Sequence, residues 1–199
     1  MKSILFLVGS LRAESLNRRL ARVVAANLPD GYEAAFFDLN DVPFYNEDLK
    51  GHAPESVLAL RESIRSADGV FWATPEYNYA LPGIVKNAID WTTRPMLPQH
   101  PIVGKPMNAA VATNSATNGI RSLSDLKRIW ANCGGVPVTT FDFVLQLAQS
   151  KFIEQDGIET IEPTSMGVLR FAIDSLARAI EGEAGAVAVA NWTARFGAA

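Results

Sequence analysis

The sequence contains one cysteine, no large excess of either charge, and no apolar run long enough to cross a membrane. With Cys133 alone, an internal disulfide is excluded, and we expect an inert, packed thiol in a cytoplasmic protein. The net charge of −3 over 199 residues gives no reason to expect a nucleic-acid partner. The apolar N-terminal run is short and ends without a small-residue cleavage site, so we expect neither a membrane anchor nor a signal peptide.

Three phosphate-handling signatures are also missing from the sequence. No Gly-x-x-x-x-Gly-Lys-Ser/Thr is present, which argues against a P-loop nucleotidase. No Gly-x-Gly-x-x-Gly precedes an acidic residue by about 20 positions, which argues against a dinucleotide-binding Rossmann fold. The first strand lacks the clustered Asp of a receiver-type phosphoacceptor. His52 and His100 lie far apart in loops and give no metal site. The ligand that remains after these exclusions is a mononucleotide, held by hydroxyl and amide groups without a metal.

The sequence starts with an apolar run at residues 4–8, and from Leu16 onward apolar residues recur at helical spacing. An unalternating apolar run of this kind predicts a strand buried on both faces. Between strand and helix lies a loop rich in hydrogen-bond donors, and a helix start favours anions. Ser15 or Asn17 alone is better explained as a helix cap, and Arg12 alone could be a surface charge. Four donors within eight residues together favour a phosphate-binding loop: Ser10, Arg12, Ser15 and Asn17.

Strand and helix patterns alternate along the rest of the chain. Apolar segments predict strands over 32–39, 70–73, 107–113 and 136–138, and helical stripes predict helices over 55–66, 81–91, 120–133 and 163–181. Residues 92–106 read as a loop, 141–162 as a region with extended pieces, and 182–199 give no clear pattern. We expect one α/β domain over residues 1–199, an open parallel sheet with helices on both faces. The polar turns after strands one, three and four would share its carboxyl edge, where such folds bind ligands.

Several segments resemble the NADPH-dependent FMN reductase family of flavodoxin-like proteins, which includes quinone, azo-dye and chromate reductases. They are GSLRAESLN, PFYNEDL, and PEYNYALPGIVKNAIDWTTRP followed by GKP. The resemblance covers most of residues 3–135, and its most specific piece is PEYN followed by LPGIVKNAIDW. It implies a five-stranded parallel sheet in the order 2-1-3-4-5, bound FMN, NADPH or NADH as co-substrate, and a homodimer or homotetramer.

The resemblance also implies the site residues. The segment that holds the FMN phosphate is matched by Ser10, Arg12, Ser15, Leu16 and Asn17, and the loop that lines the isoalloxazine ring by Pro75, Glu76, Tyr77 and Asn78. The turn at 114–119 takes the place of a third flavin loop, with Ser115 and Gly119 as expected contacts, although the family often shows Gly-Ala-Ser and more glycines there. Tyr79 stands where many members have glycine, which narrows the space near the ring.

The chemistry asks little of the side chains, because the flavin itself carries the hydride. We therefore expect no catalytic residue, a structural role for Glu76 and a packing role for Tyr77. The favoured function is an FMN-dependent NAD(P)H oxidoreductase that works by a ping-pong cycle on quinones, free flavin, azo compounds or similar small acceptors. An FMN-binding electron carrier or redox sensor with a protein partner, and a phospholigand-binding protein without flavin, remain as alternatives. Each of three arginines, Arg12, Arg18 and Arg19, could either bind a 2′-phosphate or face solvent. The sequence therefore leaves open whether the co-substrate is NADPH or NADH.

Overall fold

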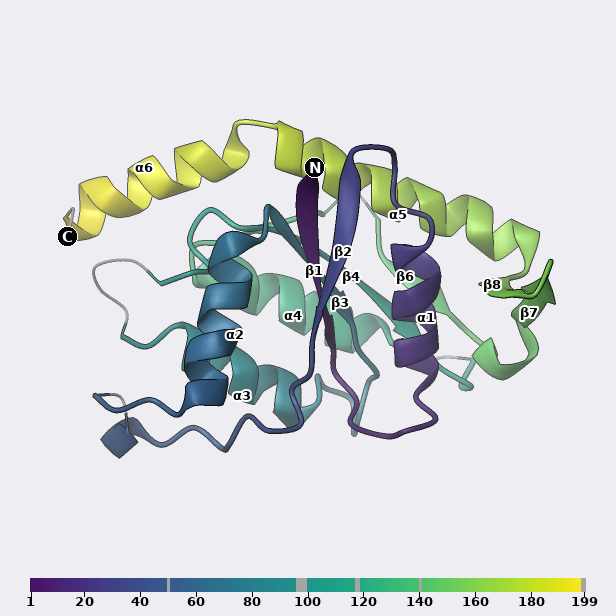
Figure 1. Cartoon of the computed structure of the whole chain (residues 1–199), viewed down its shortest axis with the longest axis horizontal. Coiled ribbons are helices and arrows are strands. Elements are labelled where there is room, and N and C mark those ends of the chain that lie inside the picture. The colour runs from purple at the N-terminus through teal and green to yellow at the C-terminus, as the bar shows by residue number, and fades with distance from the viewer. Residues whose placement is uncertain (50, 96–99, 117–118, 140, 198–199) are drawn as a thin grey trace.

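A parallel sheet forms the centre of the protein, seen in a computed structural model that describes residues 1–49, 51–95, 100–116, 119–139 and 141–197. Its strands run in the order β2-β1-β3-β4-β5, and β6 pairs with β4 beyond β5 (Figure 1). This confirms the predicted order. Their bounds are β1 Lys2–Val8, β2 Tyr32–Phe37, β3 Gly69–Ala73, β4 Pro106–Ala112, β5 Val136–Pro137 and β6 Phe143–Leu145.

The predicted fifth strand is divided in two. β5 pairs with the start of β4 through Pro106–Val136, and β6 pairs with its end through Ala110–Phe143. Pro137 has no N–H to donate, so it is tolerated only where a strand has a free edge. The chain leaves the sheet after Val138 and returns at Phe143, which is why the sequence shows only a short strand there.

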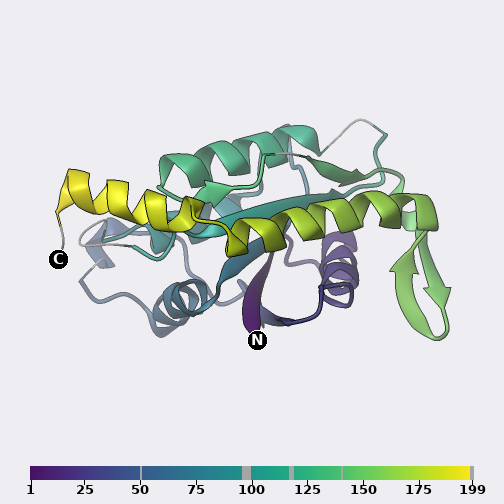
Figure 2. The same ribbon diagram turned by 90° about the horizontal axis from the view of Figure 1, so that it is seen from above.

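Helices cover both faces of the sheet (Figures 1 and 2). α1 and α5 pack on one face, and α2, α3 and α4 pack on the other. The predicted helices are present, and the first of them, α1, ends at Ala25. Among the described residues no helix is long and apolar enough to cross a membrane. The α-helices have the bounds α1 Leu16–Ala25, α2 Glu55–Ser66, α3 Gly83–Thr92, α4 Ile120–Asn132, α5 Pro163–Glu181 and α6 Ala184–Phe196.

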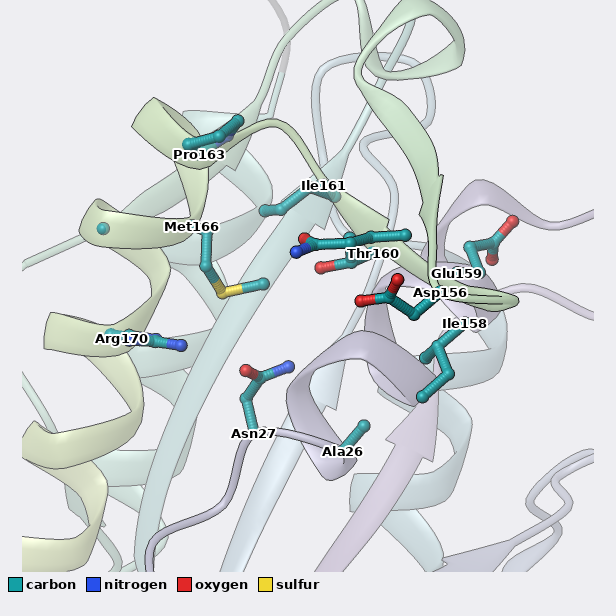
Figure 3. A pocket seen from close by; sticks show the side chains of 12 residues that line it. Ala26, Asn27, Asp156, Ile158, Glu159, Thr160, Ile161, Pro163, Met166 and Arg170 are labelled. Carbon is teal, nitrogen blue, oxygen red and sulfur yellow. The ribbon is translucent and has the colours of Figure 1, made fainter.

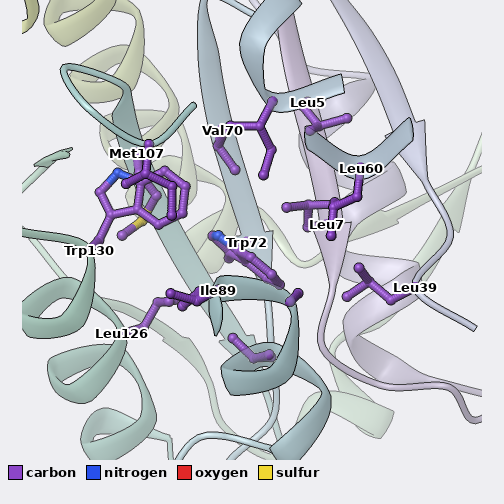
Figure 4. Packing of buried hydrophobic residues seen from close by; sticks show 14 of the residues in the cluster. Leu5, Leu7, Leu39, Leu60, Val70, Trp72, Ile89, Met107, Leu126 and Trp130 are labelled. Atoms are coloured by element: carbon purple, nitrogen blue, oxygen red, sulfur yellow. The ribbon is translucent and has the colours of Figure 1, made fainter. Parts of the chain in front are cut away.

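The core consists of two apolar layers, one on each side of the sheet. Successive residues of β1 alternate between them: Phe6 joins the layer under α1 and α5, and Leu7 the layer under α2 to α4. Figure 4 shows the second layer, in which Trp72 and Trp130 are almost completely buried. Burial on both faces explains why β1, β3 and β4 read as continuous apolar runs.

The region after β6 contains the extended pieces that the sequence suggested. β7 (Phe152–Gln155) and β8 (Ile158–Ile161) form an antiparallel hairpin that stands out at one end of the protein (Figure 2). The unassigned tail forms α6, and none of the residues of α6 is fully buried. Two short 3₁₀ helices complete the described structure, at Glu47–Leu49 and Ala148–Ser150.

Candidate functional site

The three predicted binding loops lie on one edge of the sheet, because they follow the carboxyl ends of β1, β3 and β4. The hydroxyl oxygens of Ser10 and Tyr77 are 3.5 Å apart, so the first two loops are adjacent. The Ser122 hydroxyl at the start of α4 donates to the carbonyl of Pro75 at 2.9 Å. This bond joins the second loop to α4, the helix that follows the third loop. Of the third loop, residues 117 and 118 lie outside the described residues.

The loop after β1 has the features of an anion site. Ser15 caps α1 by accepting a hydrogen bond from the amide of Arg18 at 3.2 Å. The amides of Leu16 and Asn17, at the start of the helix, have no acceptor among the described residues, as is usual for a helix N-terminus. Ser10 is buried beside them and Arg12 is exposed. Hydroxyls, free amides and a guanidinium therefore lie within one short loop.

The side chain of Asn17 is bonded to the sheet. Its side-chain amide is buried and bonds to the backbone of Ala112, the last residue of β4. Asn17 can still donate to a ligand from its backbone amide and from the second hydrogen of its Nδ2. Sequence reasoning identified Asn17 as a phosphate donor, and the structure adds a partner 95 residues away that no local pattern could reveal.

Gly9 brings the loop after β1 close to its neighbours. A Cβ at this position would lie 2.3 Å from the Thr74 hydroxyl and 2.6 Å from a methyl group of Val85. Its amide donates to the carbonyl of Ala73 at 2.9 Å. Glycine is needed here because β3 and α3 approach the chain directly, and the approach fixes where the loop starts.

Glu76 holds the second and third loops together. Its carboxylate accepts from the amides of Gly119 and Arg121, at 2.8 and 3.1 Å, and from the Arg121 guanidinium at 3.0 Å. The side chain is only 1% exposed. Burial by itself raises the pKa of Glu76, but these hydrogen bonds outweigh it and hold the pKa below its ordinary value. The carboxylate therefore stays ionised at neutral pH, as its predicted structural role requires. Arg121 and Ser122 were not identified from the sequence.

The second loop ends in a tight turn. Tyr77 and Ala80 exchange two backbone hydrogen bonds, at 3.0 and 3.1 Å. The two residues between them have left-handed backbones, with φ of 50° at Asn78 and 68° at Tyr79. Asn adopts this conformation readily and Tyr does not. Tyr79 is largely exposed, and the Arg121 guanidinium lies 5.1 Å from the centre of its ring. The turn thus extends the contact between the second and third loops.

A fourth segment, the loop after β2, is attached to α3. The carbonyl of Pro43 accepts from the side-chain amide of Asn87 at 2.9 Å and from the indole of Trp91 at 2.7 Å. The amide of Tyr45 donates to Asn87 at 2.7 Å. Trp91 is fully buried and belongs to the core. These bonds explain why Asn and Trp sit one turn apart in the segment KNAIDW.

A cavity of about 530 Å³ lies away from these loops (Figure 3). It is enclosed by the hairpin, the first turns of α5 and the end of α1, and its lining includes Asn27, Thr160, Met166 and Arg170. Asn27 follows the C-terminal end of α1, opposite the loop at residues 9–15. None of the predicted site residues lines this cavity.

The chemistry of the loop residues fits FMN. Two buried serine hydroxyls, Ser10 and Ser15, and the free amides at the start of α1 are suited to a phosphate ester. The loop at 75–80, fixed by Glu76 and by its own turn, is a rigid edge beside them. A flavin needs such an edge to stay oriented, since the protein supplies mainly position and hydrogen bonds.

Comparison with known proteins identifies the family. The family described as NADPH-dependent FMN reductase matches residues 2–150. The chain belongs to this family. It is 36% identical over 157 residues to a quinone reductase of Escherichia coli, a match that covers 77% of this chain and 82% of that protein. An NAD(P)H-dependent FMN reductase of Pseudomonas aeruginosa is 34% identical over 153 residues, covering 76% and 82%.

A solved structure gives the same answer for the fold. FerB, a flavoenzyme NAD(P)H:(acceptor) oxidoreductase from Paracoccus denitrificans, superimposes with a TM-score of 0.82 at 32% identity, covering 91% of this chain and 98% of FerB. The predicted family, flavodoxin-like fold, enzyme class and cofactor are thereby confirmed. The individual FMN contacts, Ser115 and Gly119 included, stay predictions.

Proposed function

We propose that the edge formed by residues 9–17, 75–80 and 113–121 binds FMN, and that the enzyme uses it to pass electrons from NAD(P)H to quinones and similar small acceptors. The observation that carries this proposal is the continuity of the edge, in which Ser10 meets Tyr77 and Glu76 holds Gly119. Relatives named quinone reductase and 2-hydroxy-1,4-benzoquinone reductase support the acceptor class.

Bound FMN would accept a hydride from the nicotinamide and release it to the acceptor. The chain's own residues bind and orient. Ser10, Ser15 and the amides at the start of α1 hold the phosphate, and Arg12 adds the positive charge. Pro75 to Asn78 line the ring. Glu76 stays ionised and fixes the loops, and it exchanges no proton with substrate. Nicotinamide and acceptor would use the same face in turn, which gives ping-pong kinetics.

The test is an absorbance spectrum of the purified protein after it has been mixed with FMN and desalted. We expect flavin bands that correspond to one FMN per chain, and bleaching by NADPH under anaerobic conditions without any partner protein. The S15A and R12Q variants should retain less FMN, whereas R178Q, at the far end of α5, should retain as much as the wild type. A colourless protein would contradict the proposal, and flavin that NADPH alone cannot bleach would favour an electron carrier.

We further propose that residues 1–199 form a single domain and that the protein is cytoplasmic. We propose in addition that it assembles as a homodimer or homotetramer. Support for self-association comes from the large apolar side chains at the surface, of which Phe44 is 85% exposed. Support for a reducing compartment comes from Cys133, which as a single cysteine cannot form an internal disulfide. Light scattering after gel filtration would give the mass, and a monomer would contradict the assembly.

A further inference from the structure

A second cavity opens on the carboxyl edge of the sheet, between α1 and the end of β2. Its volume is about 330 Å³, and it reaches Val8, the last residue of β1, next to the predicted phosphate loop. None of the residues assigned to FMN lines it. Four side chains give the cavity its chemistry: Arg18, Arg22, Phe36 and Asp38.

Arg18 and Arg22 place two positive charges at this cavity. Arg18 and Arg22 are four residues apart on α1, so they lie on the same face of the helix. The Nε atom of Arg18 is buried and has no hydrogen-bond partner among the residues that the structure describes. Across the described part of the chain neither arginine forms an ion pair. A buried donor without an acceptor is unfavourable, and an anion with several oxygen atoms would satisfy both guanidinium groups.

Arg19 shows what a structural arginine on this helix looks like. Its guanidinium pairs with Glu159 at 2.7 Å and lies 4.0 Å from the centre of the Phe152 ring. Arg19 therefore attaches the hairpin to α1 and is committed to that contact. Of the three arginines that the sequence left open for a 2′-phosphate, Arg12 belongs to the FMN loop, and only Arg18 lines this cavity.

Phe36 gives the cavity an aromatic wall. Its side chain is 52% exposed although it is apolar. The ring is stacked on that of Phe6, with centroids 5.0 Å apart and an interplanar angle of 22°. Phe6 is buried in turn against Phe71. A ring held in this way is a fixed platform for a planar apolar group, such as a purine.

Asp38 adds an acceptor at the end of β2. Its Oδ1 accepts from the amide of Asn40 at 3.0 Å, and the residue lines the cavity. One carboxylate against two guanidinium groups leaves the cavity with net positive charge. Carboxylates bind hydroxyl and amino groups well. The cavity therefore offers a match for an anion, a planar ring and a hydrogen-bond donor in one ligand.

We propose that this cavity binds the adenosine 2′-phosphate end of NADPH, with the phosphate at Arg18 and Arg22 and the adenine against Phe36. The inference rests on the proposed function, because it deepens the choice of reductant. A volume of about 330 Å³ suits a nucleoside-sized group better than a whole dinucleotide. NADH lacks only the 2′-phosphate, so the arginine pair makes NADPH the preferred reductant.

The first experiment is calorimetric titration of the FMN-loaded protein with adenosine 2′,5′-bisphosphate and, separately, with adenosine 5′-phosphate. We expect the bisphosphate to bind more tightly to the wild type. The double variant R18Q/R22Q should lose about tenfold or more in affinity for it, as expected when charge-assisted hydrogen bonds are removed. R19Q is the matched control on the same helix and should bind like the wild type. Equal affinity of the wild type for the two nucleotides, or unchanged affinity in the double variant, would overturn the inference.

Kinetics of the same proteins separate this inference from the proposed function. We expect R18Q/R22Q to raise the KM for NADPH by about tenfold while FMN content and the KM for NADH stay the same. If the wild type retains no FMN, the proposed function fails, whereas the same bisphosphate titration of the flavin-free protein still reports on the cavity. If the wild type retains FMN and the double variant handles NADPH as before, the inference alone fails. Thermal melting followed by circular dichroism confirms that each variant is folded.

Discussion

The side-chain amide of Asn17 pairs with the backbone of Ala112 through two hydrogen bonds. Nδ2 of Asn17 donates to the Ala112 carbonyl at 3.0 Å, and the Ala112 amide donates to Oδ1 of Asn17 at 2.8 Å. Both residues are 3% exposed. This pair attaches the start of α1 to the end of β4, and so it fixes the loop before α1 relative to the loop after β4. The anion loop is thus positioned by the sheet, with Asn17 as the link.

Replacement of Asn17 by leucine should destabilise the protein. The change leaves a buried N–H and a buried C=O of Ala112 without partners, which costs about 2–4 kcal/mol. Urea unfolding measures the loss, and the same variant should retain less FMN. Asn27 is the control, because its amide makes one local bond, to the carbonyl of Val23, and N27A should cost about 1 kcal/mol or less. Equal losses in the two variants would contradict the special role of Asn17.

The Glu76 carboxylate should matter for loop order and not for proton transfer. In E76Q an amide NH₂ group faces donors of Gly119 or Arg121, so at least one hydrogen bond is lost. We expect a loss of about 2 kcal/mol in stability, weaker FMN binding, and nearly normal turnover once FMN is saturating. E62Q, which removes an exposed ion pair with Arg65, should cost less than about 1 kcal/mol. A large fall in turnover with FMN fully bound would show that Glu76 acts in the reaction.

The strands and most helices could be predicted because each carries a local signal. β1 and β3 are buried on both faces and read as apolar runs, and Ser15 marks the start of α1. The tail could not be assigned because α6 has no buried stripe: it is composed largely of small apolar residues, and Val187 is 54% exposed. A helix without a strongly apolar face gives no clear periodic pattern.

The site was predictable as a set of loops, but not as a set of contacts. The donors at Ser10 and Ser15 lie in one local pattern, and the sheet topology places the other loops beside them. The pair Glu76 and Arg121 is separated by 45 residues, so its existence depends on how β3 and β4 lie together. The same limit applies to Arg18 and Phe36, which line one cavity only because β2 lies next to β1.

His100 should make stability depend on pH. The imidazole is 3% exposed and packs edge-on against Trp192, with ring centroids 5.1 Å apart. Burial, assisted by the charge of Arg94, lowers the pKa of His100 from 6.5 to about 4. Between pH 6.5 and pH 4 the unfolded chain therefore binds a proton that the folded protein does not. Proton binding stabilises the unfolded state, so the free energy of unfolding falls as the pH falls through this range. Between about pH 7 and about pH 5 the loss should be about 2 kcal/mol.

The H100F variant tests this dependence, since phenylalanine keeps the ring against Trp192 and cannot titrate. Urea unfolding at the two pH values should show a smaller loss for H100F than for the wild type, by about 2 kcal/mol. His52, which is exposed, serves as the control, and H52Q should follow the wild type. If H100F and the wild type lose the same free energy, His100 is not the group responsible.

Tyr79 should restrict which acceptors the enzyme accepts. Its ring stands beside the predicted flavin loop, under the Arg121 guanidinium, on a residue with a φ of 68°. Glycine adopts this backbone conformation without strain, so Y79G should fold as well as the wild type while removing the ring. We expect the ratio of kcat/KM for a large naphthoquinone to that for a small benzoquinone to rise by about tenfold. Y79F keeps the ring and should keep the wild-type ratio. An unchanged ratio in Y79G would mean that acceptors do not pass this side chain, and that the restriction lies with other residues of the edge.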